Sequence, residues 1–173
     1  MTEDFETMLT GGHPNSLGRT VEVVDAVLSS RHRLADLFQC YFSADEVVRL
    51  RVSSAMKRVT TAHPEWTMEF MDRLLGEIAE IDQASTQWTL AILFDLTKQL
   101  LSQEQKFRAL EIMKTNLAEH NDWIVLNTTM QVLFEWSGED AELREWLKPQ
   151  FKRLVKDKRK AVAGRARKLL VAI

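Results

Sequence analysis

The strongest constraint on the fold is one apolar helix pattern that returns every 37 to 40 residues. Residues 90–96 match residues 130–136 at an offset of 40, with apolar on apolar and acid on acid at nearly every place. A unit of this length predicts a helical hairpin that stacks on its neighbours, because one hairpin cannot cover its own apolar faces. A third copy lies 37 residues before residues 90–96, at Ala55, Met56 and Val59. A fourth lies 37 residues after residues 130–136, at Leu169, Leu170 and Ile173.

From Ser16 onward, apolar residues recur at spacings of three and four, which predicts an all-α chain of about nine helices. Six glycines and three prolines are too few for a protein of short strands and turns. Small or β-branched residues recur one turn before each copy, where the helix would press closely on its pair-mate: Val52, Thr89, Thr129 and Ala166. Expected helix starts lie at Asn15 or Ser16, Ser43, Pro64, Ser102, Asn121 and Gly138.

Residues 45–56 run as an acid, Val-Arg, small residues and Ala-Met, and residues 157–170 repeat much of this order. In both segments the chain resembles the HEAT-repeat (armadillo-like) family. The middle copies depart from the pattern, with Ser85-Thr86 and Val125-Leu126 at the Val-Arg position. The resemblance implies an α-solenoid of four to five helical hairpins, with one helix of each pair lining a concave face. It covers residues 16–173 as a single domain, which leaves residues 1–15 as an N-terminal arm.

Charge is divided unevenly along the chain. Residues 148–173 contain ten basic residues and one acidic residue, net +9, whereas residues 1–147 contain 13 basic and 24 acidic residues, net −11. The basic end is either a solvated face or a footprint for an anionic partner. No aromatic residue follows Phe151 to stack on bases. The basic segment is therefore compatible with nucleic-acid binding but does not by itself indicate it. The candidate nucleic-acid contacts are Lys152, Lys156, Arg159, Arg167 and Lys168.

Five tryptophans are many for this length. Trp136 falls in the apolar register and is expected in the core, and Trp66 is expected to pack on the preceding turn. Trp88 shares the register of Arg51 and Arg165, which predicts an exposed row of aromatic and Arg residues suited to a protein interface. Inter-repeat packing is the alternative for most of them. The candidate partner-binding residues are Arg51, Trp88, Trp123, Trp146 and Arg165.

The segment 10–20 holds three of the six glycines just before an expected helix. Free N–H groups at that helix start, with an Arg in its first turn, predict a receptor for a carboxylate or phosphate. The alternative is an arm that turns at the Gly pair and caps the first helix. The candidate anion-binding residues are Gly11, Gly12, His13, Asn15, Ser16 and Arg19.

Few residues form a pattern that suggests catalysis. The histidines are widely separated, and His32 with Asp36 supplies two metal ligands at most, so this pair is interpreted as an ordinary helix-surface pair. Cys40 has no partner thiol and is expected to be a small buried hydrophobe. We therefore expect no metal, no cofactor and no catalytic residue.

No signal-peptide pattern and no long apolar run occurs, and the single Cys suits a reducing compartment, so a soluble cytoplasmic protein is expected. The leading hypothesis is a non-enzymatic binding module that docks a protein partner. One alternative is nucleic-acid binding, because the chain resembles the HEAT-like alkylation-repair DNA glycosylases. Another is small-molecule or lyase-type chemistry, as in HEAT-like bilin lyases, with the arm folded over the concave face. A homo-oligomer through the apolar end at residues 169–173 is also open.

Overall fold

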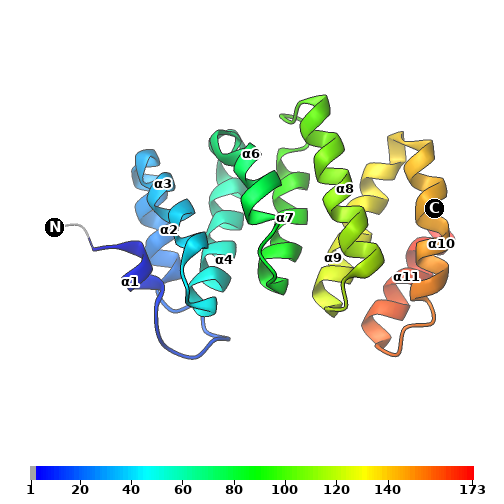
Figure 1. Ribbon diagram of the computed structural model, residues 1–173, viewed down its shortest axis with the longest axis horizontal. Helices are drawn as coiled ribbons and strands as arrows, with labels where there is room; N and C mark the ends of the chain where they lie inside the picture. Colours follow the sequence, from blue (N-terminus) through cyan, green and yellow to red (C-terminus); the bar gives the residue numbers. More distant parts are fainter. Residues whose placement is uncertain (1–2) are drawn as a thin grey trace. The chain divides into compact units, whose positions relative to one another are not determined.

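The computed structural model describes residues 3–173, and all regular structure in this range is helical, which confirms the all-α prediction. Figure 1 labels the helices and colours them along the sequence. They form two compact units, unit 1 up to Leu101 and unit 2 from Ser102 to Ile173. None of the helices in the described range combines the length and the apolarity needed to cross a membrane.

Unit 1 is built around α4, which contacts α2 on one side and α7 on another. The α4 helix begins where the Asp45 carboxylate accepts a hydrogen bond from the Val47 N–H at 2.8 Å. In chain order the elements are α1 (Phe5–Leu9), α2 (Thr20–Ser29), η1 (Arg31–Arg33), α3 (Leu34–Gln39), η2 (Cys40–Phe42), α4 (Glu46–Ala62), α5 (Pro64–Thr67), η3 (Met68–Phe70), α6 (Met71–Arg73), η4 (Leu74–Ile78) and α7 (Ala84–Thr97).

Unit 2 contains two helical hairpins. The α8 helix contacts α9, and α10 contacts α11, while α9 also contacts α10 and α11. A complete capping box begins α8: the Ser102 Oγ accepts from the Gln105 N–H, and the Gln105 side chain accepts from the Ser102 N–H. The elements are α8 (Gln103–Glu119), α9 (Trp123–Trp136), η5 (Ser137–Glu139), α10 (Ala141–Leu154) and α11 (Lys160–Ala172).

The repeated sequence pattern falls on α4, α7, α9 and α11, which we call the register helices. Their small or β-branched positions, Val52, Thr89, Thr129 and Ala166, are all fully buried. Polar bridges also recur between the starts of successive register helices. In unit 1 the Arg49 Nε donates to Gln83 Oε1 at 2.8 Å, and in unit 2 the Arg159 Nη1 donates to the Asn121 carbonyl. Within each unit, successive register helices therefore begin at the same end.

The first expected hairpin differs from the structure in its start. The α2 helix begins at Thr20, its N-cap is Arg19, and no side chain caps it, so the expected cap by Asn15 or Ser16 is wrong. The expected cap of α4 by Ser43 is also wrong, because Asp45 takes that place and Ser43 Oγ accepts from the Asp45 N–H.

The expected arm contains a helix that the sequence reasoning missed. The α1 helix buries Phe5, Met8 and Leu9 against unit 1. The Arg33 guanidinium lies 3.8 Å from the centre of the Phe5 ring and donates to the Glu3 carbonyl at 3.2 Å. Three apolar side chains and one cation therefore hold the first helix in place.

Candidate binding surfaces

Arg51 was expected to be exposed, and this is wrong: only 2% of the residue is accessible. Its guanidinium lies under the arm and donates to four backbone carbonyls. The Nη1 atom donates to the carbonyls of Leu9 at 2.6 Å and Gly11 at 2.5 Å. The other bonds run from Nε to Ser16 at 3.2 Å and from Nη2 to His13 at 3.3 Å. We call Arg51 with these four carbonyls the Arg51 latch. Carbonyl dipoles compensate the burial of this charge, which is why the side chain is not free for a partner.

The arm reaches Arg51 through glycines in left-handed backbone conformations. Gly11, Gly12 and Gly18 have φ values of +77°, +76° and +51°, a region that L-residues with a Cβ rarely adopt. A Cβ on Gly18 would lie 2.9 Å from Arg51 Cζ, whereas a Cβ on Gly11 would meet nothing within 4 Å. The absence of a side chain at Gly18 therefore allows the backbone of the arm to lie close to the Arg51 guanidinium.

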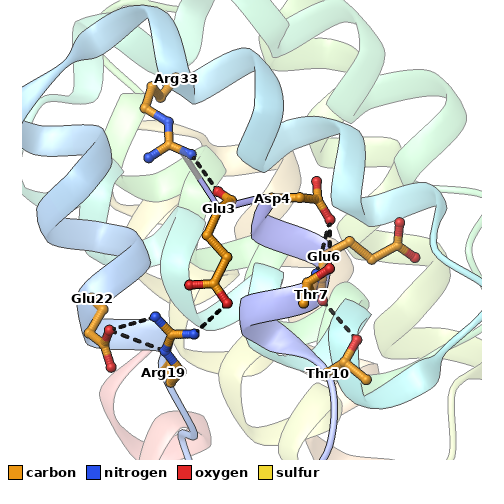
Figure 2. A network of polar contacts seen from close by, with 8 residues as sticks. All are labelled: Glu3, Asp4, Glu6, Thr7, Thr10, Arg19, Glu22 and Arg33. Atoms are coloured by element: carbon orange, nitrogen blue, oxygen red, sulfur yellow. Dashed lines mark hydrogen bonds and ion pairs between the residues drawn. The ribbon is translucent and has the colours of Figure 1, made fainter. Parts of the chain in front are cut away.

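The remaining residues of the candidate anion-binding arm make local contacts. Figure 2 shows the Arg19 guanidinium between Glu3 and Glu22, at 2.8 Å and 3.0 Å. The hydrogen bond that the Arg19 Nη1 donates to the Glu3 carboxylate lowers the pKa of Glu3. The His13 Nδ1 accepts from the Asn15 N–H, and the Ser16 Oγ accepts from the Gly18 N–H. Two carboxylates thus already neutralise the one cation that was expected to receive an anion.

Two of the candidate tryptophans are half-buried beneath lysines. The Lys57 Nζ lies 5.4 Å from the Trp88 ring centre, and the Lys114 Nζ lies 5.4 Å from that of Trp146. Both contacts are cation–π interactions within one unit. The predictions for the other tryptophans hold, because Trp136 is buried and Trp66 stacks on His63 with 4.0 Å between ring centres.

Trp123 is different, because 48% of the residue is exposed at the start of α9. The turn that precedes it lies beside the turn from α10 to α11, since Arg159 donates to the carbonyl and the side chain of Asn121. Figure 1 shows both turns at the same end of unit 2. The second turn carries Lys156 and Lys158, which are exposed and form no ion pair within residues 3–173. We call Trp123, Lys156 and Lys158 the Trp123 edge.

Asp157 fixes the shape of this turn. Its carboxylate accepts from the backbone N–H, the Nε and the Nη2 of Arg159, at 2.8, 2.8 and 2.7 Å. These hydrogen bonds lower the pKa of Asp157 to about 2. Arg159, a candidate nucleic-acid contact, is therefore bound within the protein and positions the Trp123 edge. The sequence signal was the single acid among basic residues at 156–160, which the sequence reasoning did not use.

The outer face of α11 carries the other candidate cations. Lys160, Arg167 and Lys168 are exposed without an ion pair in the described part of the chain, as is Lys152 on α10. Arg165 is exposed as expected and donates to Gln131 Oε1 on α9 at 2.7 Å. Arg51 and Trp88 belong to unit 1 and Arg165 to unit 2.

The described residues hold no group of three or more metal-binding side chains. His32 contacts Ser30 Oγ at 2.9 Å, and Asp36 lies 3.7 Å from Arg33, so the expected His32–Asp36 pair is wrong. Cys40 is buried as predicted, and burial together with nearby carboxylates raises the pKa of its thiol to about 12. It lines a hollow of about 350 Å³ whose carboxylates are Glu3, Asp4, Glu6 and Asp36. A thiol with this raised pKa stays protonated near neutral pH, where it is a poor nucleophile.

Comparisons of the chain with protein-family models, with curated proteins and with solved structures find no match.

Proposed function

We propose that the protein is a non-enzymatic binding module that docks an acidic segment of a protein partner on the Trp123 edge. The observation that carries this proposal is the half-exposed Trp123 at a turn that Arg159 bonds to the neighbouring turn, which carries two lysines with no ion pair among residues 3–173. Exposure of a large apolar ring to water is unfavourable. A partner that covers the ring therefore gains binding free energy.

The chemistry of the edge favours an acidic protein segment. Tryptophan is enriched among residues that dominate protein–protein binding energy, and charged residues are typical of the surrounding rim. The rim lysines attract acidic side chains and raise the rate of encounter. Arg159 and Asp157 hold the turn in one shape before binding, which lowers the entropy lost on docking.

The proposed scaffold is an α-solenoid of HEAT-like hairpins in the cytoplasm. The support comes from the stacking inside each unit, where register helices contact the next register helix and begin at the same end. In such an array each hairpin covers its neighbour and leaves edges free for partners.

The proposal is tested by cross-linking followed by affinity measurement. A photo-crosslinking amino acid placed at position 123 is expected to capture a protein in native lysate, and the partner is then identified and purified. Trp123→Ala should weaken its binding to the wild-type chain about 30-fold, the loss typical of a hot-spot residue. Lys156→Glu with Lys158→Glu should weaken it further at low salt.

The matched control is Phe107 on α8, another exposed aromatic residue of unit 2, at 64%. The same cross-linker at position 107 should not capture the partner, and Phe107→Ala should leave the affinity unchanged. Equal capture at both positions, or an unchanged affinity for Trp123→Ala, would show that the edge is not the docking site.

Nucleic acid is the second candidate, because cations without an ion pair in the described range gather in the last two helices and their turn: Lys152, Lys156, Lys158, Lys160, Arg167 and Lys168. If they neutralise phosphates, the affinity for a single-stranded DNA probe should fall about 300-fold between about 50 and 200 mM salt. Fluorescence anisotropy measures this. No binding at the lower salt removes this candidate and leaves the protein-docking proposal intact. The lyase-type alternative gains no support, since the arm's carbonyls are already bound to Arg51.

A further inference from the structure

We propose that the chain associates head-to-tail with a second copy, the outer face of α11 in one copy packing on the outer face of α2 in the next. This contact goes beyond the Trp123 edge and uses other residues. The argument rests on the two uncovered helix faces and on their opposite charges.

The α2 helix contacts α4, and its Val23, Val24 and Val27 are buried. The α1 and α3 helices also contact α2, but one face stays exposed and is partly apolar: Val21 is 47% and Leu28 is 37% exposed, seven residues apart and therefore on one face. Asp25 lies between them in sequence and forms no ion pair in the described residues. The face is therefore apolar with a negative charge.

The α11 helix contacts α9 and α10, and its Val162, Ala166 and Leu169 are buried. Its uncovered side carries Val171, 86% exposed, and the cations Lys160, Arg167 and Lys168 described above. Between these cations lie exposed small residues, Ala161 and Gly164, and a Cβ on Gly164 would meet nothing within 4 Å. Because the residues between the cations are small, another helix can approach this cationic face closely.

The helix packing inside each unit shows the kind of contact that a second copy would make. In unit 1, α2 contacts α4 and α4 contacts α7, and in unit 2, α9 contacts α11. Each of these helices thus packs on a helix further along the chain. The cationic outer face of α11 in one copy, packed on the exposed and partly apolar face of α2 in another, would make a helix-on-helix contact of the same kind. Such a contact is heterologous, and it joins unlike faces.

Charge complementarity supports the same pairing. Unit 1 contains 9 basic and 15 acidic residues, net −6, and unit 2 contains 14 basic and 10 acidic residues, net +4. Opposite faces of two copies attract, whereas two α11 faces repel each other, which disfavours a symmetric dimer. The small net charge of −2 also provides little overall repulsion between copies.

The test is sedimentation velocity of the purified full chain over a concentration series at about 50 and 500 mM salt. We expect reversible association at low salt that weakens at high salt. Asp25→Lys alone and Lys168→Glu alone should each weaken it about ten-fold or more, because each places like charges opposite one another. The control Glu104→Lys, on exposed α8 surface, should leave the association unchanged.

Mixing the two variants separates a specific contact from a loss of folding. A head-to-tail contact places the new carboxylate at position 168 of one variant against the new ammonium group at position 25 of the other, so the equimolar mixture should associate like wild type. Failure of the mixture to associate would overturn the proposal, as would a wild-type chain that stays monomeric at low salt. A dimer that neither variant affects would likewise overturn it.

Discussion

At the scale of single residues, Arg51 is the side chain on which the order of the N-terminal segment depends. Arg51→Met keeps much of the length of the side chain but leaves four carbonyls without their donor. We expect a loss of about 1–3 kcal/mol in the free energy of unfolding and faster proteolysis within residues 10–19. Urea unfolding and limited proteolysis measure these effects. Arg165→Met, on an exposed helix face, should change stability by less than about 0.5 kcal/mol, and equal effects at both positions would contradict the role of the Arg51 latch.

Gly18→Ala tests the close approach to Arg51 directly. The new Cβ would be strained by the positive φ and would lie 2.9 Å from a guanidinium carbon held by four hydrogen bonds. We expect a cost of about 1–3 kcal/mol from thermal or urea unfolding. Gly11→Ala is the matched control, because it also has a positive φ but has open space around the Cβ. Its cost should be smaller, and a larger cost at Gly11 would exclude the steric explanation.

Cys40 and Tyr41 make the protein sensitive to alkali. Burial raises the pKa of Cys40 to about 12 and raises that of Tyr41 above its ordinary value of 10.0. The folded state therefore favours the neutral forms, so their contribution to stability is constant below about pH 9 and falls as the pH rises toward 12. Each group contributes a slope of about 1.4 kcal/mol per pH unit. Urea unfolding at several pH values measures the slope, which Cys40→Ala should reduce. A stability that does not change between about pH 9 and pH 11 would contradict this prediction.

At the scale of helices, the start of α8 offers a clean measurement. Ser102→Ala removes the oxygen that accepts from the Gln105 N–H and breaks the capping box. We expect a loss of about 1 kcal/mol in the free energy of unfolding. The control is Ser29→Ala, an exposed residue in the last turn of α2 rather than at a cap, where the change should be near zero. A Ser102→Ala variant as stable as wild type would mean that the capping box does not contribute to the free energy of unfolding.

The caps also show how far sequence reasoning reaches. Ser102 was identified because a cap depends on residues three apart in sequence. The start of α2 was misplaced because the arm before it is shaped by Arg51, which lies more than 30 residues away. The exposure of Arg51 was mispredicted for the same reason: a polar register position is buried when a distant segment covers it. The edge at Trp123 was found only in part, since its neighbouring turn depends on the bond from Arg159 to Asn121.

At the scale of the whole molecule, the proposed solenoid makes a prediction about size. A globular chain of 173 residues has a radius of gyration of about 16 Å. A stack of hairpins is longer, so small-angle X-ray scattering should give a clearly larger value. The measurement belongs at high salt and low concentration, where the proposed association between copies is weakest. A value at the globular limit would contradict the stacked arrangement.

The Arg51 latch also sets an order of events during synthesis. The carbonyls of Leu9 and Gly11 leave the ribosome about forty residues before the guanidinium that binds them. These carbonyls cannot form their bonds to Arg51 until the α4 sequence has left the ribosome and become helical. Only then can the segment around Leu9 and Gly11 close over Arg51, so it takes its final structure later than its place in the sequence suggests.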